Sequence, residues 1–288
     1  MNEIYLFSFF LLLGWVLRKQ LSHKQKSHLK LTTYLILLAF VSASLWINGL
    51  PADASILLLV GGLLQIIPSL FGVLVKNNSY RTSFLLFGTY GGGSRGMLAL
   101  SILSPALLPI FIIIDLGNFL ALILFYPLLL KLGLRKEHNQ TIEKSNYYTL
   151  LISLTVVSIS LLLNKYVTSF NITTTHIFLK YLLIALTSFQ IGVYLSINLK
   201  CILWTFKSIL IVRFMAILMP LLLIFCLSPN GKNDIYIVIF LFSVLPVSSI
   251  AVSLLPQNAD SSFQESLSCA VTASTLIFIS IVVVISLF

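Results

Sequence analysis

The most unusual feature of this sequence is a glycine-rich segment that carries a single arginine inside an otherwise apolar run. Gly88–Gly96 holds five glycines in nine residues, together with Arg95. Glycine weakens a helix, and in hydrocarbon each freed N–H or C=O group costs several kcal/mol unless protein or water satisfies it. The segment therefore predicts an interrupted helix that lines a cavity and offers main-chain groups to a ligand. The alternative is close helix packing through a face of small residues.

Arg95 is the charged residue of this segment. A charge near the centre of a bilayer costs about 2.5–3.5 kcal/mol on insertion scales, so such a residue normally faces a polar interior. A guanidinium can grip a carboxylate with two hydrogen bonds. We expect Arg95 either to contact an anionic substrate, pairing with Asp115 when the site is empty, or to form a permanent structural pair with Asp115.

Asp115 lies in the middle of the next apolar run, in the segment Ile114-Asp115-Leu116-Gly117-Asn118. A carboxylate at this depth could carry a coupling proton. It could also bind Na⁺ together with Asn118 and freed main-chain carbonyls. We therefore predict Asp115 and Asn118 as ion-coupling residues, with the structural partnership to Arg95 as the alternative.

A second helix-breaking segment lies late in the chain, where Pro246 is followed by Ser248 and Ser249. Proline removes a backbone donor and clashes with the preceding turn. The serines could supply neutral hydrogen-bond donors opposite the glycine-rich segment, or they could bond back to their own helix. The predicted substrate-binding residues are Gly91, Gly92, Gly93, Ser94, Arg95, Pro246, Ser248 and Ser249.

The composition shows which solvent surrounds these segments. The chain has 288 residues, of which 58% are hydrophobic and 9% charged, whereas a soluble domain carries about 25% charged residues. A bilayer core requires roughly 20 apolar residues per helix. Ten runs fit that length and predict an all-α, polytopic membrane protein: Met1–Leu17, Leu29–Ile47, Ala54–Val75, Arg81–Leu103, Pro105–Leu130, Tyr147–Leu163, His176–Asn198, Thr205–Leu227, Asp234–Leu255 and Phe263–Phe288.

The basic residues orient the ten predicted spans. The loops after spans 1, 3, 5 and 7 hold thirteen lysines and arginines, whereas the loops after spans 2, 4, 6 and 8 hold only Lys165 and Lys232. Cytoplasmic loops are enriched in these residues, so both termini are predicted outside the cytoplasmic (inner) membrane. The net charge of +10 is explained in this way, and nucleic acid is not an expected partner.

The central polar loop, Lys131–Asn146, divides the chain into two halves of five spans. Residues 1–146 and 147–288 each contain a helix-breaking segment in their fourth span, and Pro68 and Pro220 lie at similar depths in the third. Repeats with an odd number of spans must lie in opposite orientations across the membrane. This is the inverted-repeat arrangement of many secondary transporters, and it predicts broken helices in spans 4 and 9.

The remaining polar residues suggest no separate chemistry. Lys180 and Arg213 lie within about two turns of predicted span ends, so we expect them to reach toward the interface. The three cysteines are far apart in sequence and predict no disulfide or metal framework. There is no G-x-x-x-x-G-K-[ST] signature and no catalytic triad, so neither a cofactor nor an enzyme is predicted.

Several segments resemble the auxin efflux carrier family of permeases, in its bacterial branch. They are Phe10–Lys19 in the first predicted span, Leu29–Tyr34 in the second, Asp115–Asn118 in the fifth, Leu245–Ser249 in the ninth and Ser268–Ser280 in the tenth. The resemblance implies a scaffold of spans 1, 2, 6 and 7. It also implies a transport unit of spans 3–5 and 8–10 whose broken spans 4 and 9 cross at the site, and an organic anion such as a carboxylate as substrate.

The residues and the resemblance together predict a secondary transporter of a small organic anion that works by alternating access. Its expected partners are the anion, a coupling proton or Na⁺, membrane lipid and, as one option, a second copy of the chain. Two other classes remain open. One is a non-transporting membrane sensor or assembly partner, which would tolerate substitution of Arg95 and Asp115. The other is an intramembrane enzyme, which would need a titratable cluster near one membrane face.

Overall fold

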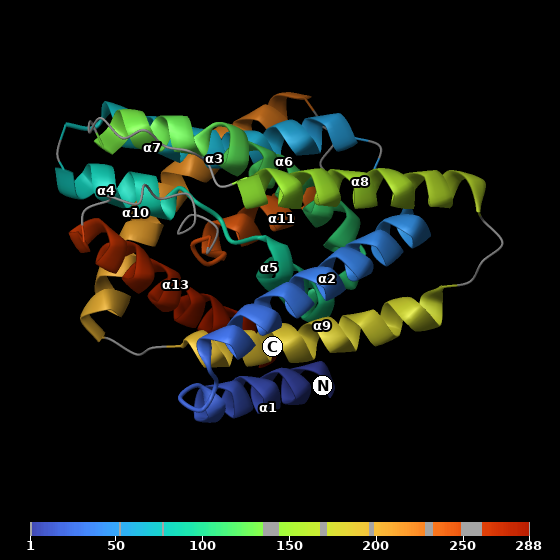
Figure 1. Ribbon diagram of the computed structural model, residues 1–288. Coiled ribbons are helices and arrows are strands. Elements are labelled where there is room, and N and C mark those ends of the chain that lie inside the picture. The colour runs from blue at the N-terminus through green and yellow to red at the C-terminus, as the bar shows by residue number, and fades with distance from the viewer. Residues whose placement is uncertain are drawn as a thin grey trace.

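The computed structural model describes residues 2–51, 53–76, 78–134, 144–167, 172–195, 199–227, 233–248 and 261–287, and within them every regular element is a helix (Figure 1). The helices are α1 (Asn2–Leu17), α2 (His23–Asn48), α3 (Ala54–Leu74), α4 (Asn78–Phe87), α5 (Gly93–Leu103), α6 (Leu108–Leu124), α7 (Tyr126–Leu134), α8 (Lys144–Tyr166), α9 (Thr173–Tyr194), α10 (Leu199–Leu227), α11 (Asn233–Val244) and α13 (Ser261–Leu287), with the 3₁₀ turn η1 (Pro105–Leu107) before α6. The predicted all-α class is confirmed.

Six helical segments in the described part of the chain are long and apolar enough to cross a bilayer. They are Lys24–Asn48, Ala54–Leu74, Pro105–Leu124, Thr173–Tyr194, Ile202–Cys226 and Glu265–Ile285. Shorter apolar helices occupy Glu3–Leu17, Leu151–Tyr166 and Asn233–Val244. Large apolar side chains such as Leu74 and Leu203 are more than 70% exposed on the helix surfaces. Such a surface is suited to lipid, and the chain is therefore a membrane protein.

Several helix boundaries differ from the predicted spans. α2 begins at His23 rather than Leu29, because Ser22 and Gln25 form a capping box that starts the helix within the basic segment. The fifth predicted span is divided into α6 and α7 at Phe125, next to Pro127, which lacks an N–H donor. α10 begins at Leu199 instead of Thr205, which places its polar residues deeper than the sequence indicated.

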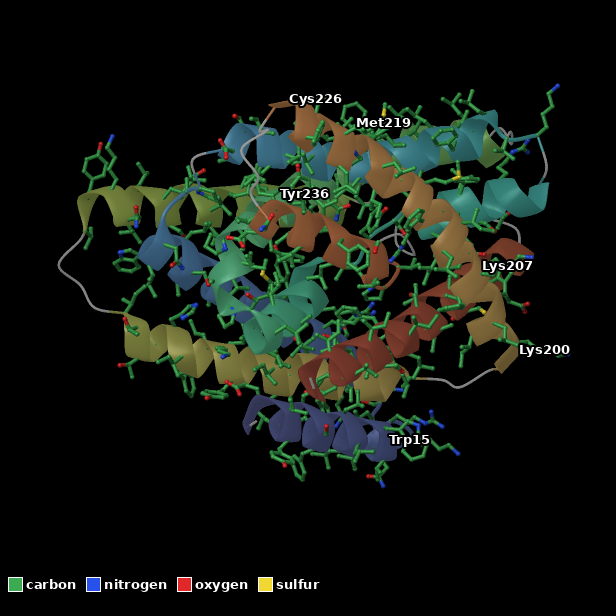
Figure 2. The ribbon with its side chains drawn as sticks, turned by 180° about the vertical axis from the view of Figure 1, so that it is seen from behind. Trp15, Lys200, Lys207, Met219, Cys226 and Tyr236 are labelled. Atoms are coloured by element: carbon green, nitrogen blue, oxygen red, sulfur yellow. The ribbon has the colours of Figure 1, made fainter. Side chains whose placement is uncertain are left out.

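Hydrogen bonds between helices give their relative directions. α1 and α9 run parallel, because Glu3 pairs with Lys180 (3.1 Å) near their beginnings and Arg18 donates to the Leu195 carbonyl (2.6 Å) near their ends. Lys180 thus forms an ion pair instead of only reaching toward the interface. At the far end of α1, the guanidinium of Arg18 lies over the ring of Trp15. In Figure 2, Trp15 lies toward the same end of the molecule as Lys200 and Lys207 at the beginning of α10.

Side-chain contacts also give the relative directions of three further helix pairs. α2 and α8 run parallel, as shown by the hydroxyl contacts Tyr34–Ser153 (3.0 Å) and Ser42–Ser160 (2.7 Å). α4 and α10 also run parallel, because the hydroxyls of Ser83 and Ser208 (3.5 Å) meet before Arg213 reaches the end of α4. α2 and α9 are antiparallel, with contacts Ser44–His176 (2.9 Å) and Lys26–Tyr194 (3.4 Å) at opposite ends.

Short helices lie at the centre of this arrangement. Figure 1 shows α5 and α11 in the middle of the molecule, with longer helices around them. Phe111 of α6 and Phe242 of α11 stack at 5.0 Å within the main core cluster. A β-carbon at Gly96 of α5 would overlap the Phe111 ring. The two central helices are therefore held by aromatic packing.

α3 and α6 approach closely through glycines. A β-carbon at Gly61 would overlap the carbonyl oxygen of Ile114, and one at Gly117 would overlap the backbone of Leu58. Close approach of this kind is typical of membrane helices, whose association depends on van der Waals packing. It fixes α6, which carries Asp115 and Asn118, against α3.

The neighbouring glycines of α3 provide a matched test of this contact. We predict that Gly61→Ala lowers the thermal stability of the purified protein, by about 1–3 kcal/mol, because the added carbon meets rigid backbone. Gly62→Ala should be neutral or slightly stabilising, since its β-carbon meets no atom closer than 3.9 Å and alanine favours helix. Thermal unfolding in detergent measures both, and equal unfolding temperatures for the two variants would contradict the packing.

Candidate functional site

The glycine-rich segment interrupts a helix, as the sequence predicted. α4 ends at Phe87 and α5 begins at Gly93, and Gly88–Gly92 between them is not helical. Gly88 lies against α3, where an added β-carbon would come within 2.9 Å of Pro68 Cβ. A larger residue could not pass so close to α3, so glycine at this position allows the chain to leave the helix at this point.

A second interruption lies at the predicted proline. α11 ends at Val244, and Leu245–Ser248 is not helical. Pro246 cannot donate a backbone hydrogen bond, so the ladder of α11 cannot continue through it. Ser248 is buried, and the predicted site residue Ser249 lies outside the described residues.

The two interruptions cross and bond directly to each other. The Gly91 N–H donates to the carbonyl oxygen of Pro246 at 2.7 Å. A β-carbon at Gly91 would come within 3.1 Å of the carbonyl oxygens of both Pro246 and Val247. Segments about 150 residues apart in sequence therefore meet through their backbones.

Arg213 of α10 bonds to the carboxyl ends of α4 and α11, the two helices that precede the interruptions. Its side chain is fully buried. Nε donates to the Phe87 carbonyl (3.0 Å) and Nη2 to the Thr89 carbonyl (3.1 Å), both at the end of α4. Nη1 donates to the carbonyls of Ser243 (3.4 Å) and Leu245 at the end of α11.

The expectation that Arg213 reaches toward the interface is wrong. Because α10 begins at Leu199 and has 29 residues, Arg213 is the fifteenth of them and lies at its middle. The last carbonyls of a helix are unpaired and carry a partial negative charge, so a cation is favoured there. The guanidinium also lies 4.7 Å from the centre of the Tyr90 ring, which adds a cation–π contact.

Asp115 of α6 caps the opposite end of the first interruption. Its carboxylate accepts a hydrogen bond from the Gly93 N–H at the start of α5. It is packed so tightly on Gly92 that a β-carbon there would overlap it. A negative group is favoured at a helix N-terminus. Asn118, one turn further on, donates to Asp115 Oδ1 (3.4 Å) and to the carbonyl of Tyr90 (3.3 Å).

A serine performs a similar task at the second interruption. The Val247 N–H donates to Ser274 Oγ of α13 at 2.8 Å. Ser274 is fully buried and was not singled out by the sequence. Ser243 donates to the carbonyl of Phe240 in its own helix (2.6 Å), so for this serine the bond back to its own helix is the one that forms.

Arg95 lies in the first turn of α5, beside the crossing. Its Nη1 is 3.5 Å from the Val247 carbonyl oxygen. Arg95 and Asp115 form no ion pair, although both belong to the described part of the chain, so the predicted pairing is absent from this structure. Gly91, Gly93, Ser94, Arg95 and Asp115 are partly exposed, whereas Tyr90, Gly92, Gly96 and Asn118 around them are buried.

A buried amide next to the crossing was also missed. Gln65 of α3 is 1% exposed, and neither its Oε1 nor its Nε2 has a hydrogen-bond partner in the part of the chain that the structure describes. It lies one turn from Gly61, which contacts the Asn118 backbone, and three residues from Pro68, which contacts Gly88. Asn118 Oδ1 and the Tyr90 hydroxyl are likewise buried without a partner. The crossing is thus surrounded by polar atoms with unused hydrogen-bonding capacity.

The chain matches no protein-family model and no curated protein. The arrangement of the site therefore carries the functional argument alone.

Arg213 provides the sharpest test of how the site is held. Arg213→Leu should lower stability by about 3–5 kcal/mol, because four carbonyls at two helix ends lose their donor. The stability of Arg213→Lys should lie between that of Arg213→Leu and that of wild type, because an ammonium group lacks the planar fork of donors of a guanidinium. Lys207→Gln, an exposed change on the same helix, is the control. Thermal unfolding measures the series, and leucine and control variants of equal stability would refute the assigned role.

Proposed function

We propose that this protein is a secondary transporter that moves a small organic anion, such as a carboxylate, across the cytoplasmic membrane by alternating access. The observation that carries the proposal is the direct contact of two interrupted helices, Gly91 to Pro246, beside partly exposed charged residues. Interrupted helices that meet within a membrane protein are typical of transporter binding sites, because their free backbone groups and dipoles serve the ligand.

The region around Arg95 favours an anion. Positive charge in the first turn of a helix is unfavourable, because that end of the helix dipole is itself positive. An anion placed there is attracted by the guanidinium and by the backbone N–H groups together. Arg95 has five N–H donors, and only the contact with Val247 uses one of them among the described residues. The substrate class in this proposal follows from these free donors.

Asp115 provides a physical reason for coupling anion transport to a proton or a Na⁺ ion. Its carboxylate lies at the start of α5 against Gly92, close to where the anion would bind, and two negative groups in a site of low dielectric repel each other. A proton or a Na⁺ ion on Asp115 would remove that repulsion. The loaded site would then hold balanced charges at Arg95 and Asp115, which lowers the cost of moving through an apolar barrier.

The proposed architecture is ten spans in two inverted repeats, residues 1–146 and 147–288, with both termini outside and spans 4 and 9 broken. Two parallel helix pairs support this architecture. In it, span 1 corresponds to span 6 and span 7 corresponds to span 2. The parallel pair α1 and α9 (spans 1 and 7) therefore corresponds to the pair α8 and α2 (spans 6 and 2), which is also parallel. The ends of α1 and α10 that carry basic residues lie on one side (Figure 2), consistent with a cytoplasmic face. Within this proposal the chain is a permease similar to the auxin efflux carriers.

Arg95→Gln tests the proposal. Reconstituted in liposomes, this variant should take up a carboxylate at least about tenfold more slowly than wild type, because the anion loses its charged donor. Lys165→Gln, an exposed change on α8, should transport normally. Thermal unfolding of Arg95→Gln should match wild type within a few degrees, which separates function from folding. A panel of radiolabelled carboxylates, with and without Na⁺ and proton gradients, is the measurement.

Full transport by Arg95→Gln would remove Arg95 from the site. No uptake of any carboxylate by the wild-type protein under any gradient would overturn the transporter proposal.

A further inference from the structure

Asp115 is a carboxylate inside the protein that has no cationic partner among the described residues. Its contacts are the Gly93 N–H and the side-chain amide of Asn118 at 3.4 Å. Neither Arg95 nor Arg213 pairs with it: Arg95 contacts the Val247 carbonyl, and Arg213 donates to four carbonyls at the ends of α4 and α11. A charged carboxylate withdrawn from water is costly unless a cation or a full set of donors compensates it. The site therefore favours an added positive charge.

The surrounding polar atoms have the spacing of a small cation site. Asn118 Nδ2 lies 3.4 Å from Asp115 Oδ1 and 3.3 Å from the carbonyl oxygen of Tyr90. Both distances are long for hydrogen bonds of an amide donor. A half-turn of the Asn118 amide exchanges its oxygen and nitrogen. Three oxygen atoms would then lie at the positions of Asp115 Oδ1, Asn118 Oδ1 and Tyr90 O.

Na⁺ is close in size to Ca²⁺, which binds oxygen ligands at about 2.4 Å. Ligands at right angles around such an ion are then about 3.4 Å apart, by the same geometry. That separation agrees with the two distances measured from Asn118. The larger K⁺ ion requires a wider ring of oxygens, so the spacing favours Na⁺.

The amide of Asn118 also has unused capacity. Asn118 is 2% exposed, and its Oδ1 has no hydrogen-bond partner. The half-turn of the amide would move this oxygen from a position without a partner to the cation, and Nδ2 would take the position that Oδ1 now holds. Asp115 remains partly exposed, so its carboxylate is accessible to an ion.

We propose that Asp115, Asn118 and the main-chain carbonyl of Tyr90 form a Na⁺ site. The further statement that this Na⁺ is the coupling ion rests on the proposed transport function. With Na⁺ bound at Asp115 and the anion at Arg95, each charge in the site has a partner. Without Na⁺, the carboxylate of Asp115 repels the anion, so binding of the two ligands is mutually favourable.

The first experiment is binding of radiolabelled Na⁺ to the purified full-length protein, with thermal unfolding in NaCl, KCl and choline chloride at equal ionic strength. Na⁺ should bind saturably and raise the unfolding temperature by a few degrees, as expected for a ligand of the folded state. K⁺ and choline should not. Asp115→Asn and Asn118→Leu should each weaken Na⁺ binding at least about tenfold, whereas Asn164→Leu on α8, an amide that instead bonds to the Trp46 carbonyl, should leave it unchanged.

The outcomes separate the two proposals. Absence of Na⁺-specific binding and stabilisation in wild type overturns the Na⁺ site, even if carboxylate uptake proceeds on a proton gradient. Na⁺ binding that depends on Asp115 and Asn118 supports the site, even if no carboxylate is transported. If Asn118→Leu fails to fold, Asp115→Asn and the wild-type ion series still decide the question.

Discussion

The contact on which the rest of the structure depends is the buried guanidinium of Arg213 against the carboxyl ends of two interrupted helices. An interrupted helix inside a membrane protein leaves carbonyls without partners, and no lipid can satisfy them. Arg213 provides donors to Phe87 and Thr89 at one end and to Ser243 and Leu245 at the other. One side chain thereby stabilises both breaks and fixes their mutual position. Burial of a single positive charge is costly, and here the negative ends of two helix dipoles compensate it.

The other polar residues of the crossing complement this contact. Asp115 accepts from the Gly93 N–H, on the far side of the first break from Arg213, and Ser274 accepts from the Val247 N–H within the second break. The backbone of the crossing is then held by partners from α6, α10 and α13, and Gly91 bonds directly to Pro246. Arg95 differs from Arg213, because within the described residues it uses only one of its donors, on the Val247 carbonyl. Under the proposed function, Arg213 with its donors satisfied is a structural charge, and Arg95 with most of its donors unused is the charge that would bind the anion.

The sequence predicted those features that depend on local composition. Apolar runs located the helices, and the glycine density of Gly88–Gly96 and the proline at position 246 located both breaks, because each acts on its own backbone. The role of Arg213 was not predictable from a span that begins at Thr205, because six residues before Thr205 also belong to the helix. The position of the helix start decides whether this charge lies near the end of the helix or at its middle. A comparison of Arg213 with the whole apolar run from Cys201 to Leu227 would have indicated its depth.

Contacts between distant segments could not be predicted from the sequence, for a different reason. Nothing local indicates that Gln65 would be buried without a partner, or that Ser274 would receive the Val247 N–H. The predicted pair Arg95–Asp115 failed because it treated two opposite charges as each other's best partner. The start of α5 offered Asp115 a backbone donor at Gly93. The expectation that the cysteines form no disulfide also failed for Cys269, which is disulfide-bonded, whereas Cys226 is free.

An experimental structure of the wild-type protein in lipid nanodiscs tests the central claim most directly. We predict that both helices are interrupted, at Gly88–Gly92 and Leu245–Ser248. The Gly91 nitrogen should lie within hydrogen-bonding distance of the Pro246 oxygen, at about 2.7 Å, and the Arg213 side chain should lie between the ends of α4 and α11. Two continuous helices, or an Arg213 side chain directed away from both breaks, would contradict it.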